Sequence, residues 1–222
     1  MLDVIILVPE ITKGMKSVGS KALLKIKDSL SVLEYQIQQL KKCRKNNIHI
    51  IGGFEIEKIY KTLSKYKVNI IENRQYLFTN QAKGIKLFLE NNNCNNLFIV
   101  SNGILFKNNP FDCMSNGQSK VFLIDKPKTN FNIGCADTDS DDVNYLFYDL
   151  PLAWSECSFF NKEAIDKFME LYEQQNLDQM YLFEIINKLV SNNIRFDKQT
   201  IAKKNIMKIN SVTDLSKAKI FI

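Results

Sequence analysis

The chain has 222 residues and a formal net charge of +6. It is long enough to bury one sizeable core, and no apolar run approaches the roughly 20 residues that a membrane-spanning helix needs. Five cysteines without a CxxC pair and a single histidine argue against a zinc site. We therefore expect free, mostly buried thiols in a reducing compartment, and a cytoplasmic protein.

Strand and helix patterns alternate through the first half of the chain. The predicted strands are Val4–Val8, Ile48–Ile51, Val68–Ile71 and Leu97–Val100. The predicted helices between them are Ser31–Cys43, Glu55–Tyr66 and Thr79–Glu90. Ser31 and Glu34 have the spacing of a capping box at the start of the first helix. The series predicts right-handed crossovers and a parallel sheet, in which a continuous apolar run such as Val4–Val8 is buried on both faces.

After Phe106 the pattern changes to short strands separated by turns. The predicted strands are Val121–Ile124, Phe131–Ala136, Val143–Tyr148 and Trp154–Phe160. They are followed by helices Glu163–Glu173 and Asp178–Ser191, strands Ile194–Phe196 and Ile206–Ile209, and a last helix Val212–Lys219. Ligands of open α/β sheets bind outside the carboxyl ends of the strands. The segments after Val8, Ile51, Ile71 and Val100 are therefore the candidate site.

The segment Val4–Leu24 reads VIILVPEITKGMKSVGSKALL. It resembles, without a gap, the opening LAAGxGTRMxxxxPKALL of sugar-nucleotide and phosphocholine nucleotidyltransferases. In that family glycines and an arginine wrap the nucleotide phosphates. The two glycine positions, the arginine and the proline are here Glu10, Thr12, Gly14 and Ser20. Lys21 is unchanged, and the resemblance implies that it is catalytic, stabilising charge on the transferring group.

Three further segments resemble the same family in the same order. HIIGGFEIEKI, from His49, is similar to the second strand and turn, IVVVGYKAEKI, and we expect His49 to be a core residue and Gly53 to permit a tight turn. ENRQYLFTNQAKGIKLFLE, from Glu72, is similar to NPxYxxTNNxxSLxxA, where Asn80 would lie near the nucleotide and Thr79 would cap the helix. AWSECSFFNKEAIDKF, from Ala153, is similar to the strand that enters the acceptor side.

Two segments carry the positions at which the family binds magnesium. LFIVSNGILF, from Leu97, is similar to LLVVNGDVLF, and Asn102-Gly103 stands where the Gly-Asp pair belongs. IMKINSVTDLSKAKIF, from Ile206, is similar to WxEIDTPEDLEKAE, and Asn210 stands where the second metal aspartate belongs. Magnesium prefers carboxylate oxygens. The resemblance thus implies Mg²⁺ if the protein is active, and we assign no metal ligand.

The resemblance covers nearly the whole chain. It implies an α/β, Rossmann-like, three-layer α/β/α nucleotidyltransferase fold of the glycosyltransferase-A type, with a mixed, mainly parallel central sheet. Residues 1–222 would form one domain, with a nucleotide-binding half at 1–110 and an acceptor-binding half at 111–222. The implied nucleotide-binding residues are Val8, Pro9, Glu10, Thr12, Lys13, Gly14, Lys21, Asn80 and Asn102.

Four residues are candidates for the acceptor pocket: Tyr145, Trp154, Glu156 and Glu184. An aromatic cage with Glu156 would suit a choline-like cation. Core packing of the aromatic rings and a solvated helix face for Glu184 are the alternatives. The lysine-rich stretch from Lys13 to Lys67 suits nucleotide phosphates or is a solvated face.

Two functions remain open. The first is nucleotidyl transfer from a nucleoside triphosphate to a sugar phosphate or phosphocholine with release of pyrophosphate, in surface-polysaccharide or lipid-headgroup metabolism. The second is a catalytically inactive homologue that binds a nucleotide, a sugar phosphate or a protein. A glycosyltransferase that uses a nucleotide sugar is disfavoured, because the only Asp-x-Asp run, Asp137–Asp141, falls on the wrong strand. We expect no nucleic-acid partner; the oligomeric state, a homo-oligomer included, is open.

Overall fold

The computed structural model describes residues 2–8, 19–42, 46–108, 111, 117–124 and 131–222. These residues form a central nine-stranded sheet whose main path runs β10-β9-β11-β6-β1-β4-β5, with β8 pairing β11 and β12 pairing β8. The parallel half comprises β1 (Leu2–Leu7), β4 (Asn46–Gly52), β5 (Asn69–Glu72) and β6 (Asn96–Ser101). The predicted parallel arrangement of these four strands is confirmed.

The second half adds strands of both directions. It comprises β8 (Ser119–Ile124), β9 (Ile133–Cys135), β10 (Leu146–Tyr148), β11 (Leu152–Asn161) and β12 (Phe196–Ile201). Strand β11 joins the halves, because it runs antiparallel to both β6 and β8. The sheet is mixed as predicted, although β12 lies C-terminal to most of the predicted strand 194–196 and β10 is shorter than predicted.

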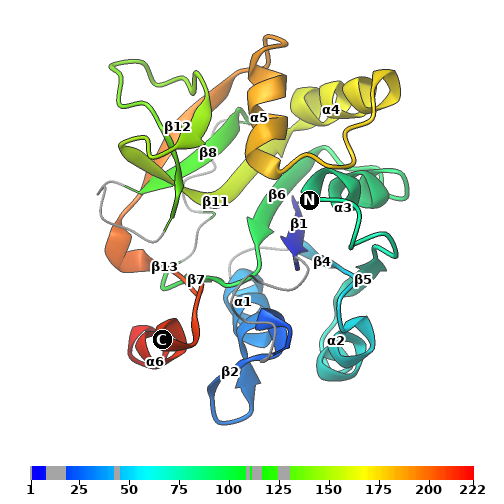
Figure 1. The fold of residues 1–222 in the computed structure, drawn as a ribbon, viewed down its shortest axis with the longest axis vertical. Coiled ribbons are helices and arrows are strands. Elements are labelled where there is room, and N and C mark those ends of the chain that lie inside the picture. The colour runs from blue at the N-terminus through cyan, green and yellow to red at the C-terminus, as the bar shows by residue number, and fades with distance from the viewer. Residues whose placement is uncertain (1, 9–18, 43–45, 109–110, 112–116, 125–130) are drawn as a thin grey trace.

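The helices cover both faces of the sheet (Figure 1). On one face lie α3 (Gln81–Leu89), α4 (Lys162–Gln174) and α5 (Leu182–Val190). On the other lie α1 (Val32–Lys41) and α2 (Ile56–Leu63). The Ser31–Glu34 capping box of α1 is present as predicted. None of the helices within the described ranges is long and apolar enough to cross a membrane.

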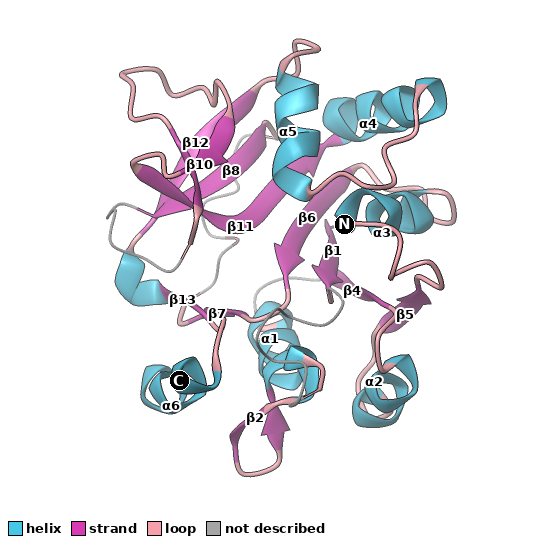
Figure 2. Ribbon diagram, in the orientation of Figure 1, coloured by secondary structure: helices cyan, strands magenta, loops and turns pink. Residues whose placement is uncertain are grey.

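Smaller elements complete the fold beside the sheet (Figure 2). They are the hairpin of β2 (Lys25–Lys27) and β3 (Leu30–Ser31), the pair of β7 (Ile104–Phe106) and β13 (Ile206–Lys208), and α6 (Val212–Phe221). A third apolar cluster lies among them, containing Ile26, Leu105 and Ala218. The β2–β3 hairpin and β7 were not predicted from the sequence.

Strand β1 shows why the layers pack as they do. Ile5 and Leu7 belong to the cluster under α3, α4 and α5, whereas Val4 and Ile6 belong to the cluster under α1 and α2. Successive side chains of a strand point to opposite faces, so an unbroken apolar run supplies both clusters. The prediction that Val4–Val8 is buried on both faces is therefore confirmed, and so is the three-layer α/β/α arrangement that the resemblance implies.

Candidate functional site

The carboxyl ends of the parallel strands meet at one edge of the sheet. Leu7 of β1 pairs with Ile51 of β4 on one side and with Ser101 of β6 on the other. Beyond the strands, Val8 N donates to Ile51 O at 2.8 Å and Asn102 N donates to Leu7 O at 2.8 Å. These bonds bring the turns after β1, β4 and β6 together, which is the ligand-binding edge of an open α/β sheet.

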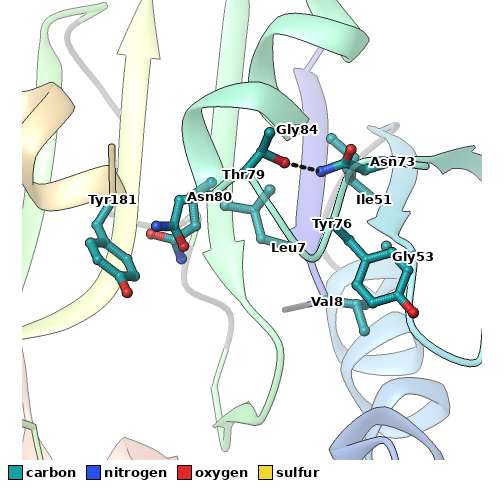
Figure 3. Close-up of a pocket in the computed structure, with 12 residues that line it drawn as sticks. Leu7, Val8, Ile51, Gly53, Asn73, Tyr76, Thr79, Asn80, Gly84 and Tyr181 are labelled. Carbon is teal, nitrogen blue, oxygen red and sulfur yellow. Dashed lines mark hydrogen bonds between the residues drawn. The ribbon is translucent and has the colours of Figure 1, made fainter. Parts of the chain in front are cut away.

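A cavity of about 120 Å³ opens at this edge. Its lining residues come from the ends of β1 and β4, from the segment between β5 and α3, from the first turn of α3, and from Tyr181, the N-cap of α5. Tyr76 and Tyr181 lie at its opposite ends, with Leu7, Val8 and Asn80 between them (Figure 3). Sites for whole small molecules usually measure about 300–1,000 Å³. This cavity therefore suits one ring of a ligand, such as a nucleobase.

Gly53 shapes the cavity through close approach. A Cβ added there would lie 2.3 Å from Cδ1 of Tyr76 and 2.5 Å from the carbonyl oxygen of Asn73. The tight turn that follows β4 uses a left-handed residue at Glu55, with φ of 53°, and not at Gly53. Gly53 does open this turn, because Ile56 N donates to its carbonyl oxygen at 3.3 Å. A glycine is needed there for close approach and not for a positive φ, since it makes room for the Tyr76 ring and the Asn73 carbonyl.

The polar residues at the start of α3 bind one another and the loop before α5. Thr79 accepts from Asn73 Nδ2 at 3.0 Å and donates to Gln75 O at 3.0 Å. The N-cap of α3 is Asn80, so the prediction that Thr79 caps this helix is wrong. Asn80 Nδ2 donates to Gln179 O at 2.8 Å, which ties α3 to the segment carrying Tyr181.

Lys21 lies in a short 3-10 helix, Lys21–Leu23, which packs against α1 and α2. The chain enters this turn through Ser20, whose N–H donates to Glu55 Oε2 at 2.7 Å. Glu55 also forms an ion pair with Lys58. The hydrogen bond from Lys58, followed by the one from Ser20 N, lowers the pKa of the Glu55 carboxyl. A carboxylate thus fixes the backbone immediately before Lys21.

The Lys21 side chain is 7% exposed and lies against the turn between β6 and β7. A Cβ added at Gly103, where φ is +91°, would lie 2.8 Å from Lys21 Cε and 2.9 Å from Nζ. Gln36 of α1 holds this turn: Nε2 donates to Ser101 O, and Oε1 accepts from Gly103 N, each at 3.1 Å. Burial lowers the pKa of Lys21 to about 8, against a smaller raising effect of Glu156.

Glu156 and Lys208 form an ion pair beside Lys21. Glu156 lies in a bulge of β11, where the register shifts between Trp154 and Ser158, and its φ is 59°. A left-handed conformation is costly for glutamate and is found where the surrounding structure enforces it. Lys208 Nζ also lies 5.4 Å from the centre of the Phe131 ring. Lys21, Glu156 and Lys208 therefore form one group of charges.

Asn102 is 1% exposed, and neither polar atom of its side-chain amide has a hydrogen-bond partner among the described residues. An unpaired buried amide costs roughly 1–3 kcal/mol. The next residue is Gly103, so this amide lies one position from the turn that contacts Lys21. Such a group is a candidate for binding a ligand oxygen, as the resemblance implies for Asn102.

The residues that the structure describes at this edge do not fit the magnesium ion that the resemblance implies. The space that a side chain at position 103 would need is taken by Lys21. Glu156, the nearby carboxylate, is paired with Lys208. Within the described ranges, no three histidine, cysteine, aspartate or glutamate side chains form a group that could hold a metal ion. An ammonium group cannot ligate a cation, and an amide oxygen such as that of Asn102 supplies no negative charge to anchor this hard one.

The structure brings some of the predicted site residues together. Val8 and Asn80 line the cavity, and Lys21 and Asn102 lie at the neighbouring turn. The predicted nucleotide-binding residues Pro9, Glu10, Thr12, Lys13 and Gly14 lie outside the described residues.

The predicted acceptor residues are more scattered. Trp154 is 3% exposed, belongs to the core and donates its indole N–H to Cys157 O at 2.9 Å, which corrects its prediction as a pocket residue. Glu184 accepts from Tyr181 N at 2.7 Å and so caps α5. Tyr145 is exposed. Of the four, Glu156 belongs to the charged group with Lys21 and Lys208.

The predictions of a core histidine and of buried, free cysteines are confirmed for the described residues. His49 is buried in β4, where its Nε2 lies 3.2 Å from Asp3 Oδ1 and its ring contacts Phe88, so it is a core residue as predicted. Cys94, Cys135 and Cys157 are buried and free.

Comparison with known proteins rests on the fold. No family model matches the sequence, and no curated protein matches it significantly. The CTP:phosphocholine cytidylyltransferase of Streptococcus pneumoniae matches with a TM-score of 0.80 and 19% identity over 99% of this chain and 98% of that one. The inositol-1-phosphate CTP transferase of T. maritima matches with a TM-score of 0.75 and 15% identity, over 99% and 94%.

A third solved structure, the nucleoside-diphosphate-sugar pyrophosphorylase of Vibrio cholerae RC9, has a TM-score of 0.72 and 15% identity over 98% of this chain and 100% of that one. The TM-scores establish a shared fold, and identities this low leave the activity open. The chain has the nucleotidyltransferase fold, which confirms at the level of the fold the resemblance drawn from its motifs.

Proposed function

We propose that this chain is a nucleotidyltransferase that joins a nucleoside triphosphate to a phosphorylated acceptor and releases pyrophosphate. The base would occupy the cavity between Tyr76 and Tyr181, and the phosphates would lie against Lys21. The observation that carries this proposal is the buried ammonium of Lys21 at the ligand-binding edge. Burying a charged lysine costs free energy, and a phosphate bound beside it would offset that cost.

In the proposed reaction a phosphate oxygen of the acceptor attacks the α-phosphorus in line. The bond from the α-phosphorus to the bridging oxygen breaks, and pyrophosphate leaves with that electron pair. Lys21 would stabilise the negative charge that builds up on the transferred group. Its buried position favours this role, because charge interactions are stronger where water is excluded.

For the acceptor we favour phosphocholine over a sugar phosphate. Four aromatic rings form a continuous row: Phe147, Tyr148, Phe183 and Tyr181, with successive centroids 5.7, 5.9 and 6.2 Å apart. Phe147, Tyr148 and Tyr181 are about half exposed, and Tyr181 also lines the cavity. Aromatic faces attract quaternary ammonium groups. This row replaces Trp154 as the candidate cage.

The alternative function is a nucleotide-binding protein without transfer activity. The observation that favours it is the replacement of the metal carboxylates by Gly103 and Asn210. The two functions differ in whether pyrophosphate is released, and both require a bound nucleotide.

The test measures pyrophosphate release with each nucleoside triphosphate and with phosphocholine or a panel of sugar phosphates, with a divalent cation or with a chelator. Transfer predicts release that Lys21→Met abolishes and Lys61→Met, at an exposed lysine of α2, leaves unchanged. Thermal stabilisation by a nucleotide without release would support the binding protein. If no nucleotide raises the melting temperature, both candidates fail.

A further inference from the structure

Lys208 is placed next to Lys21 by backbone pairing. In the β7–β13 pair, Lys208 lies opposite Ile104, and Ile209 N donates to Gly103 O at 2.9 Å. The same Gly103 carries the Lys21 side chain against it. The Lys208 side chain is 13% exposed and that of Glu156 22%. Backbone pairing thus holds the charged group at the turn after β6, where it is largely shielded from water.

The net charge of the side chains at this turn is opposite in sign to that of the ligands of a magnesium site. Lys208 stands where the motif WxEIDTPEDL has its glutamate, two residues before Asn210. Lys21 fills the space beside Gly103, where the other motif has an aspartate. Two ammonium groups and one carboxylate leave a net charge of +1. Such a group repels a dication and attracts a phosphate.

The charges of the two neighbours act on Lys21. Burial, the largest effect, lowers the pKa of Lys21, while Glu156 raises it and Lys208 lowers it. The amide of Asn102, one position from Gly103, is buried without a partner within the described ranges. The three charges thus sum to a positive value, and the amide beside them has hydrogen-bonding atoms that no described residue uses. Both properties are expected of an anion-binding site.

We propose that the ammonium groups of Lys21 and Lys208 bind the phosphates of the nucleotide directly and take the place of the divalent cation. The inference rests on the proposed function, since it concerns the phosphates of the same ligand. In the structure Glu156 neutralises Lys208. When a phosphate arrives it competes with Glu156 for that ammonium, so Glu156 opposes binding and would support it only if a metal were held there.

Calorimetric titration with inorganic pyrophosphate, which has no base, tests this site separately from the base pocket. Each titration is run with excess chelator and again with magnesium. We expect pyrophosphate to bind at least as tightly with the chelator. Lys208→Met should weaken binding about ten- to a hundredfold, as the loss of a charge-assisted hydrogen bond implies. Lys61→Met is the matched control, with the same charge change at an exposed position on α2.

Glu156→Gln gives the sharper result, because the two readings predict opposite signs. Direct binding by lysine predicts that pyrophosphate binds Glu156→Gln about fivefold more tightly, since one repelling charge is gone. Lys208→Arg should keep the metal-independent binding, and the double variant Lys208→Met/Glu156→Gln controls for an unpaired carboxylate in the single variant.

Each outcome decides one of the proposals. Binding that is at least tenfold tighter with magnesium, or weaker in Glu156→Gln, overturns the inference and leaves the nucleotidyltransferase proposal standing. If pyrophosphate binds with the chelator while no nucleoside triphosphate binds, the proposed function fails and the lysine site holds. If neither binds in either buffer, both are wrong.

Discussion

Replacing Lys21 by methionine should make the protein more stable in a way that depends on pH. The pKa of Lys21 falls from its ordinary 10.5 to about 8 on folding. One pKa unit corresponds to about 1.4 kcal/mol, so keeping this lysine charged in the fold costs about 3 kcal/mol. The unfolded chain holds the proton more tightly, and the stability of the wild type therefore rises between pH 8 and 10.5.

Methionine has a similar length and no charge, so the variant lacks this rise. The stability advantage of Lys21→Met over wild type should be largest at neutral pH and shrink by about 2 kcal/mol by roughly pH 9.5. Urea unfolding of both proteins at the two pH values measures it, and other titrating groups cancel in the difference. Lys204→Met, at an exposed position, should show no such trend. An advantage that is the same at both pH values would refute the argument that Lys21 is desolvated.

Three other substitutions test the geometry. Gly103→Ala places a Cβ against Lys21 at a φ of +91° and should cost about 2 kcal/mol or more in urea unfolding and weaken pyrophosphate binding; unchanged values in both would contradict the contact. Gly53→Ala collides with the Tyr76 ring, so thermal stabilisation by nucleotides should be lost while pyrophosphate still binds. Burial, the largest single effect, raises the pKa of Glu34, but the hydrogen bonds from Lys65 and Ser31 together outweigh it and lower the pKa to about 2. The wild type should lose up to about 3 kcal/mol as the pH falls from 4.5 to 2, and Glu34→Gln should lose less in acid titrations of stability.

Local patterns predicted the parallel half of the fold well. The continuous apolar run at Val4–Val8 and the capping box at Ser31 and Glu34 are set by neighbouring residues, and both are present. Strand β12 was mostly missed because its residues are polar and half-buried, and pairing with β8 is what makes them a strand. The hairpin at Lys25–Ser31 lacks the usual turn glycine; Asp28 takes the positive φ there instead.

The candidate site was predictable only where it follows family motifs. Lys21, Asn80 and Asn102 were identified that way, whereas Lys208 was not, although a lysine at a glutamate position signals a reversed charge. Its partner Glu156 is 52 residues away in sequence. The bulge in β11 also shifts the register, so alternation could not place Trp154 on the correct face.

The two-sided packing of β1 ties the helical layers to one strand. Because Ile5 packs in one cluster and Val4 in the other, neither layer can lose its contacts with β1 without disturbing its neighbour. Cooperative loss of structure in a single step is the expected behaviour, with the slowest amide hydrogen exchange in β1 and its partners β4 and β6. The ligand edge begins where β1 ends, so occupancy there should slow exchange on both faces of the sheet at once.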